Sequence, residues 1–192
     1  MRKSDLLFFA DEIGFDQVDL FGSALPEQFC QRITEFYIKP AEECAKQNYA
    51  FAAGVLLVSC IDALSRIRFG TVTANRFKEA PRRKRFIKFV REELQSFSSS
   101  DIAESFYRDF RCGLVHQAGL KNGGQFSFQI GTTVDDGEGL IVVNPRLLAT
   151  EVGSALRKYV TSLESDQNER TKLAKALEQD LAKDFSFARA KA

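Results

Sequence analysis

The sequence has few of the residues that most often carry chemistry. Among its 192 residues are one histidine, one methionine, four prolines, four cysteines and no tryptophan. One histidine cannot complete the common zinc sets, and no two cysteines form a C-x-x-C pair. We therefore expect no bound metal and no cofactor. We also expect reduced, mostly buried thiols at Cys30, Cys44, Cys60 and Cys112.

The chain also lacks an excess of charge and a long apolar run. Its 27 basic and 26 acidic side chains give a formal charge of +1, so total charge points to neither a nucleic-acid-binding tail nor an acidic partner. The longest apolar run, 49–61, is shorter than the roughly 20 residues of a membrane-spanning helix. Asp11 and Glu12 end the apolar N-terminal segment before it reaches signal-peptide length. The sequence predicts a cytoplasmic protein that does not enter a membrane.

What is present is typical of a helical globular domain. With 44% hydrophobic and 28% charged residues, the chain reads as one domain over 1–192. Apolar residues recur at helical spacing, which predicts an all-α fold with a helical core over about 25–163 and a C-terminal amphipathic helix over about 166–185. The core helices are expected at 26–44 with a kink at Pro40, 49–69, 82–97, 102–116 and 145–163.

One segment departs from helical spacing. Phe126, Phe128 and Ile130 alternate with polar residues, and glycine-rich turns stand at 122–124 and 135–139. This pattern predicts a β-hairpin near 125–143, inserted between helices. The two phenylalanines either pack against the bundle or offer a stacking platform for bases.

The only histidine, His116, follows Arg111 by five residues. Imidazole titrates near neutral pH, so His116 is the side chain best suited to general acid or base work. The guanidinium of Arg111 offers a fixed cation for a phosphate, and the two groups together are what metal-free RNA cleavage needs. On an ideal helical wheel both residues lie off the apolar stripe of 102–116, about 140° apart.

The segment Phe110-Arg-Cys-Gly-Leu-Val-His-Gln117 resembles the signature of the HEPN superfamily, small α-helical domains whose motif is Arg, four to six residues, then His. The helix order is similar as well, including an apolar central helix with a buried acid. The resemblance implies a HEPN-like helical bundle and a metal-independent endoribonuclease. In it, His116 acts as general base or acid and Arg111 stabilises the phosphorane-like transition state, while the 2′-hydroxyl attacks its own phosphate.

The resemblance also implies partners. RNA is the implied substrate, and because family members build their site from two facing motifs, a single motif implies a symmetric homodimer. A toxin or defence effector, with an antitoxin or regulatory protein as partner, is the implied role. Cys112 stands where active members commonly carry Asn, Asp or His, which supports an alternative: a non-catalytic HEPN-like module that binds RNA, nucleotide or a protein. A third hypothesis assigns function to the last amphipathic helix, through assembly.

Several charged residues have two interpretations each. Asp62 and Arg66, four residues apart, either form a structural ion pair or support the site. Arg108 and Cys112 are further candidates for support. The basic run contacts an RNA backbone or covers a solvated helix face; its members are Arg82, Arg83, Lys84 and Arg85.

The motif residues themselves have structural alternatives. His116 could cap the end of its helix, because helix C-termini favour a cationic histidine. Arg111 could form a surface salt bridge near Asp109 or with Glu104.

Overall fold

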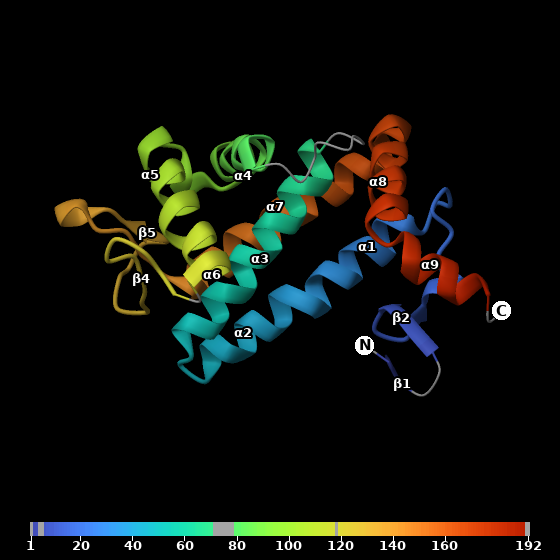
Figure 1. Ribbon diagram of the computed structural model, residues 1–192, viewed down its shortest axis with the longest axis horizontal. Helices are drawn as coiled ribbons and strands as arrows, with labels where there is room; N and C mark the ends of the chain where they lie inside the picture. Colours follow the sequence, from blue (N-terminus) through green and yellow to red (C-terminus); the bar gives the residue numbers. More distant parts are fainter. Residues whose placement is uncertain (1, 4–5, 71–78, 118, 191–192) are drawn as a thin grey trace.

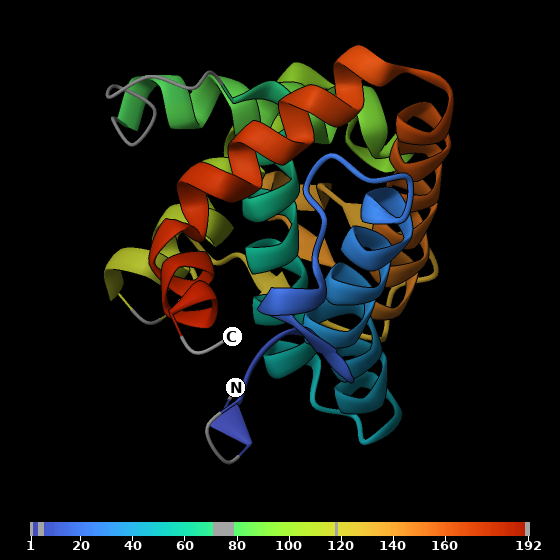
Figure 2. The same cartoon turned by 90° about the vertical axis from the view of Figure 1, so that its right-hand side faces the viewer.

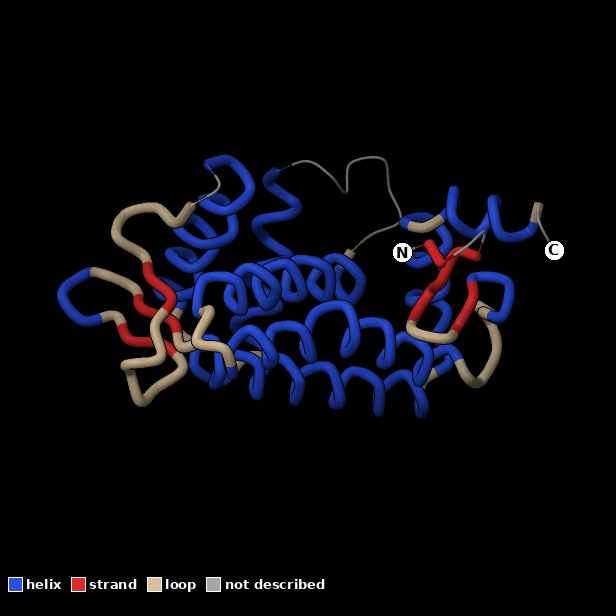
Figure 3. The backbone as a smooth tube through the Cα atoms, turned by 90° about the horizontal axis from the view of Figure 1, so that it is seen from below, coloured by secondary structure: helices blue, strands red, loops and turns tan. Residues whose placement is uncertain are grey.

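The computed structural model describes residues 2–3, 6–70, 79–117 and 119–190. Within these residues the chain is mostly helical, which confirms the helix-dominated fold (Figure 1). Two small three-stranded sheets accompany the helices, and Figure 3 shows them at opposite ends of the bundle.

The first helical rod runs from α1 (Leu25–Ile33) through the π-helical segment η2 (Thr34–Ile38) into α2 (Lys39–Lys46). Proline lies in the first turn of α1, as Pro26 predicts. Pro40 has no N–H to continue the helical ladder, and the chain widens just before it, where the Lys39 N–H bonds the Thr34 carbonyl. A π-helical segment thus stands just before Pro40, where the sequence predicts a kink.

Helix α3 (Ala50–Phe69) is the central helix, as predicted, and it packs against α2, α4, α7 and α8. By length and composition alone, it is also the one helix among the described residues that could cross a membrane, although more than half of it is buried inside the protein. The apolar run 49–61 is shorter than this helix because charged residues from Asp62 onward interrupt the run but not the helix.

The third and fourth predicted helices are built from shorter pieces. The third starts earlier than expected, as α4 (Glu79–Glu93), and ends in the 3-10 turn η4 (Gln95–Phe97). The fourth comprises α5 (Ser100–Ser105), the π-helical segment η5 (Phe106–Arg111) and α6 (Cys112–Gln117). Rings from both helices meet in the core, with centroids 4.7 Å apart for Phe97 and Phe106 and 5.8 Å apart for Phe86 and Phe106.

The inserted sheet differs from the predicted hairpin. It contains β4 (Gln125–Phe126), β5 (Val134–Asp135) and β6 (Val142–Val143), in the order β4-β6-β5. Strands β5 and β6 are antiparallel around the 3-10 turn η6 (Gly137–Gly139), but β4 pairs with β6 in parallel. Beyond Ser127, whose N–H still bonds the Val143 carbonyl of β6, the segment 128–132 lies against the start of helix α7. The Asn144 amide donates to the Ile130 carbonyl at 2.9 Å, and the Arg146 guanidinium lies 4.2 Å from the Phe128 ring centroid.

Phe126 and Phe128 are half-buried, which confirms that they pack against the bundle. The Phe126 ring lies edge-on to Phe110, with centroids 5.1 Å apart. It fits because Gly54 of α3 has no side chain: a Cβ there would lie 2.4 Å from the ring. The sheet is thereby fixed to the two helices that carry the candidate site.

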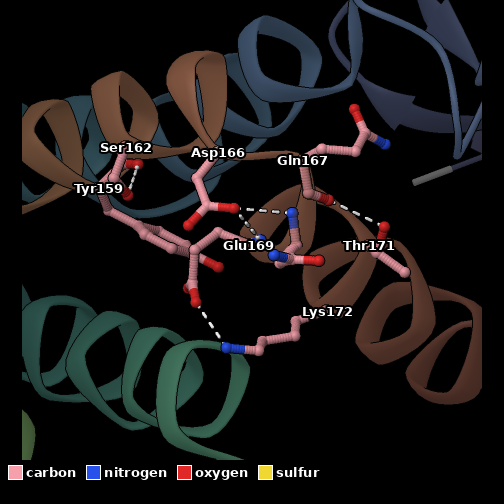
Figure 4. A network of polar contacts seen from close by, with 8 residues as sticks. Tyr159, Ser162, Asp166, Gln167, Glu169, Thr171 and Lys172 are labelled. Carbon is pink, nitrogen blue, oxygen red and sulfur yellow. Dashed lines mark hydrogen bonds and ion pairs between the residues drawn. The ribbon is translucent and has the colours of Figure 1, made fainter.

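The chain ends in three helices, α7 (Pro145–Ser165), α8 (Gln167–Asp180) and α9 (Ala182–Arg189). Asn144 caps α7, as predicted, and accepts the Arg146 N–H at 3.0 Å. The prediction of a single C-terminal helix over 166–185 is wrong, because Leu181 interrupts the helix and separates α8 from α9. Figure 4 shows the junction of α7 and α8, where the Asp166 side chain accepts the Asn168 and Glu169 N–H groups.

The N-terminal sheet was not predicted. It contains β1 (Arg2–Lys3), β2 (Leu6–Ala10) and β3 (Ile13–Gly14), followed by the 3-10 turn η1 (Phe15–Gln17). Phe185 of α9 packs edge-on against Phe15, with centroids 4.9 Å apart, so both ends of the chain meet at one end of the bundle (Figure 2). Arg32 of α1 donates to the Phe9 carbonyl and faces the Phe9 ring, and burial lowers the pKa of its guanidinium.

Candidate functional site

Arg111 is the last residue of the π-helical segment η5, and its side chain is buried, with 5% of the residue exposed. The expectation that it lies off the apolar stripe is therefore wrong. An ideal wheel assumes α-helical spacing, whereas here the Cys112 N–H bonds the Tyr107 carbonyl five residues back. This wider turn changes the angular position of every later residue. It places Arg111 against α3.

The carboxylate of Asp62 in α3 forms an ion pair with the Arg111 guanidinium. Its two carboxylate oxygens lie 3.2 Å from Nε and 3.4 Å from Nη2 of Arg111. The third nitrogen, Nη1, is buried and has no hydrogen-bond partner among the described residues. Burial opposes the positive charge, but the hydrogen bonds and the charge of Asp62 outweigh it, so the pKa of Arg111 lies above its ordinary value. Arg111 is thus held as a cation with one of its three nitrogens unused for hydrogen bonding.

This geometry corrects two ion-pair predictions. Asp62 does not pair with Arg66, whose Nε instead lies 3.2 Å from a carboxylate oxygen of Asp180 in α8. Arg111 forms no surface salt bridge near Asp109 or Glu104, because Arg108 and Arg83 occupy those acids.

A pocket of about 230 Å³ lies where α3 meets the motif helix, that is, η5 and α6 together. It brings together Asp62, Arg66 and Arg111, three of the residues that the sequence singles out. Leu114 of α6 also lines it. The remaining lining residues are Tyr37, Val58, Ser59 and Ala63. With two guanidinium groups on its wall, the pocket suits a small anion more than a cation or an apolar ligand.

The basic run divides between two sides of α4. Arg85 is buried, with 8% of the residue exposed, and it lies close enough to Asp62 and Arg66 for their charges to affect its pKa. Arg83 points the other way and pairs with Glu104 at 2.5 Å. Together with Lys84, Arg83 lines a separate groove of about 370 Å³. Residues 82–85 therefore do not form one continuous solvated face, and RNA binding by Arg82, Arg83, Lys84 and Arg85 stays a prediction.

Arg108 and Cys112 do not line the described pocket. Arg108 forms a two-point contact with Asp109, at 2.7 Å for both bonds, and the hydrogen bond to Asp109 is the main cause of its raised pKa. Cys112 is half-buried, as are Cys30 and Cys44, so only Cys60 is a fully buried thiol, and burial raises its pKa. The other three thiols are partly buried and pack against the core.

The loop that follows the motif is a feature that the sequence did not predict. Asp109 is 4% exposed, and the Asn122 amide donates to its carboxylate at 2.6 Å, while the Lys121 N–H donates to its backbone carbonyl at 2.9 Å. Gly113 lets the loop approach, since a Cβ there would lie 2.5 Å from the Gly119 carbonyl oxygen. The loop thus braces the helix that carries Arg111.

Replacing Gly113 by Ala should destabilise the protein by about 1–3 kcal/mol, because the methyl group forces the loop away from the helix. Gly131→Ala is the matched control, since a Cβ there has nothing within 4 Å. Urea unfolding measures both. Equal free energies of unfolding for the two variants would contradict this role of Gly113.

His116 lies in α6, five residues after Arg111. The position of its side chain lies outside the described residues, and so do its predicted roles as acid, base or helix cap. Within the described part of the chain, no group of three or more His, Cys, Asp or Glu residues could hold a metal ion.

Comparisons with known proteins return no match. No family model, no curated protein and no solved structure matches the chain. The fold and the pocket therefore define a helical domain with an arginine-lined site, and its activity must be argued from that site.

Proposed function

We propose that the chain is a HEPN-like, metal-independent endoribonuclease that uses Arg111 and His116. The observation that carries the proposal is the state of Arg111, a buried cation on a pocket wall with one nitrogen unused for hydrogen bonding. Phosphate oxygens are strong acceptors for such a donor. The only histidine of the chain lies on the same helical run, a little more than one turn away.

The proposed reaction needs no component beyond RNA and these groups. A base, His116, takes the proton of a 2′-hydroxyl, and the 2′-oxygen attacks the adjacent phosphorus. The bond to the 5′-oxygen breaks, and the departing oxygen takes a proton from an acid. Arg111 stabilises the charge that develops on the phosphate oxygens. The products are a 2′,3′-cyclic phosphate and a 5′-hydroxyl.

The acid and the base are two groups, whereas the chain has one histidine. We therefore propose a two-fold homodimer with the fourth predicted helix, which comprises α5, η5 and α6, at or beside the interface, in which each copy supplies one imidazole. A cytoplasmic toxin or defence effector restrained by an antitoxin or regulatory protein is the biological role that fits this activity.

One observation favours a second candidate, a non-catalytic module that binds RNA, nucleotide or a protein partner. Asp62 already occupies two of the three nitrogens of Arg111. In that case the arginine mainly joins α3 to the motif helix, and Cys112, in place of Asn, Asp or His, marks the loss of catalysis.

The purified protein should cleave single-stranded RNA in the presence of EDTA and leave cyclic-phosphate ends. Denaturing gels and mass spectrometry of the fragments measure this. Cleavage that depends on added magnesium would contradict the mechanism, and RNA binding without cleavage would favour the non-catalytic module.

A further inference from the structure

Arg66 lies on the same pocket as Arg111, and a carboxylate from the far end of the chain neutralises it. Its Nε lies 3.2 Å from a carboxylate oxygen of Asp180, the last residue of α8. Asp180 is well covered, with 12% of its side chain exposed, while 34% of the Arg66 side chain remains exposed. Arg66 therefore still faces solvent at the pocket.

The pair is held by charge more than by a directed hydrogen bond. Nε of Arg66 is buried and has no partner with hydrogen-bond geometry among the described residues. Partly exposed ion pairs contribute little to stability, and a misaligned pair contributes less than a well-aligned one. Replacing the carboxylate of such a pair by another anion therefore costs little stability.

Other cations surround this point. Arg85 is buried, and burial is the main cause of its lowered pKa; the charges of Arg82 and Arg66 lower this pKa further, while that of Asp62 raises it. The guanidinium groups of Arg66, Arg85 and Arg111 thus lie near the carboxylate of Asp62, and a second carboxylate, that of Asp180, pairs with Arg66. Like charges gathered at a pocket mark a place where an added anion is stabilised.

We propose that Arg66 binds a second RNA phosphate, next to the one at Arg111, and that Asp180 occupies this subsite until RNA displaces it. The inference rests on the proposed function and adds the regulation of the same site by helix α8. The pocket, at about 230 Å³, is smaller than the roughly 300 Å³ at which cavities for whole organic ligands begin, so it suits backbone phosphates and leaves the bases outside.

The carboxylate of Asp180 acts in this arrangement as an internal competitor of the RNA backbone. Its removal should raise RNA affinity, whereas removal of Arg66 should lower it. If Asp180 lowers RNA affinity by pairing with Arg66, its removal should bring no gain in affinity once Arg66 is gone.

Fluorescence anisotropy with a 2′-O-methyl RNA oligonucleotide, which has no free 2′-hydroxyl and cannot be cleaved by this route, tests the proposal in EDTA. Asp180→Asn should tighten binding about three- to fivefold, as expected for release of a partly exposed cation from its pair. Arg66→Gln should weaken binding and reduce the salt slope by about one contact. Glu178→Gln, at an exposed acid of α8, is the matched control for Asp180→Asn. It should change neither the affinity for RNA nor the salt slope.

Asp180→Asn binding that equals or falls below that of the wild type would overturn the proposal. So would the same gain from Asp180→Asn in the Arg66→Gln background. Circular dichroism melting of each variant shows whether the fold is retained. If Asp180→Asn unfolds, Asp180→Glu takes its place as the test: it keeps the charge and should therefore keep wild-type affinity. If the wild type binds RNA with this dependence but never cleaves unmodified RNA, the nuclease proposal fails and the subsite remains.

Discussion

Replacing His116 by Ala should reduce the rate of RNA cleavage by about 10²–10⁴-fold, the usual contribution of a general acid or base. The cause is the loss of the only imidazole in the chain. Single-turnover cleavage of a labelled oligonucleotide in EDTA measures the rate. Wild-type cleavage by His116→Ala would remove the mechanism proposed for this site.

Two further variants show whether this loss is specific to the imidazole. Arg111→Lys keeps the charge but not the planar fork, and it should also lower the rate. Cys112→Asn introduces a residue common in active members of the family that the motif resembles, and its rate should equal or exceed that of the wild type. A lower rate for Cys112→Asn would argue against the resemblance.

A mixture of His116→Ala and wild-type protein tests the proposed dimer. If each site needs an imidazole from both copies, subunit exchange should lower the activity of the wild-type chains. Activity proportional to the wild-type fraction, together with a monomer by light scattering at micromolar concentration, would contradict the shared site.

Replacing Asp62 by Ala should destabilise the fold by about 2–3 kcal/mol, because it leaves the buried guanidinium of Arg111 without its carboxylate. A quarter of the Asp62 side chain is exposed, so the loss should fall short of the roughly 3–5 kcal/mol of a fully buried pair. Urea unfolding measures the difference.

Glu104→Ala is the matched control for this prediction. It breaks the Arg83–Glu104 pair, whose side chains are 52% and 35% exposed, and should cost less than about 1 kcal/mol. The double variant Asp62→Ala with Arg111→Met should recover much of the stability lost by Asp62→Ala. Similar losses for Asp62→Ala and Glu104→Ala would show that the Arg111–Asp62 pair adds no more than a surface contact.

Local sequence determined the positions of most helices. Proline at the start of α1 and the Asn144–Pro145 start of α7 gave correct boundaries, because capping and proline geometry involve only neighbouring residues. The interruption of the helix at Leu181 was missed, since apolar spacing continues across it, while α9 packs against β2 and η1 from the other end of the chain.

The sequence by itself singled out Arg111, Asp62 and Arg66, which line one pocket, and also Arg108 and Cys112, which do not line it. Only the tertiary structure decided how they pair. Spacing of four residues predicted Asp62 with Arg66, but the π-helical turn brings Arg111 to Asp62, and α8 brings Asp180 to Arg66. Partners 49 and 114 residues apart along the chain meet through packing of whole helices, and charge spacing within one helix cannot encode such contacts.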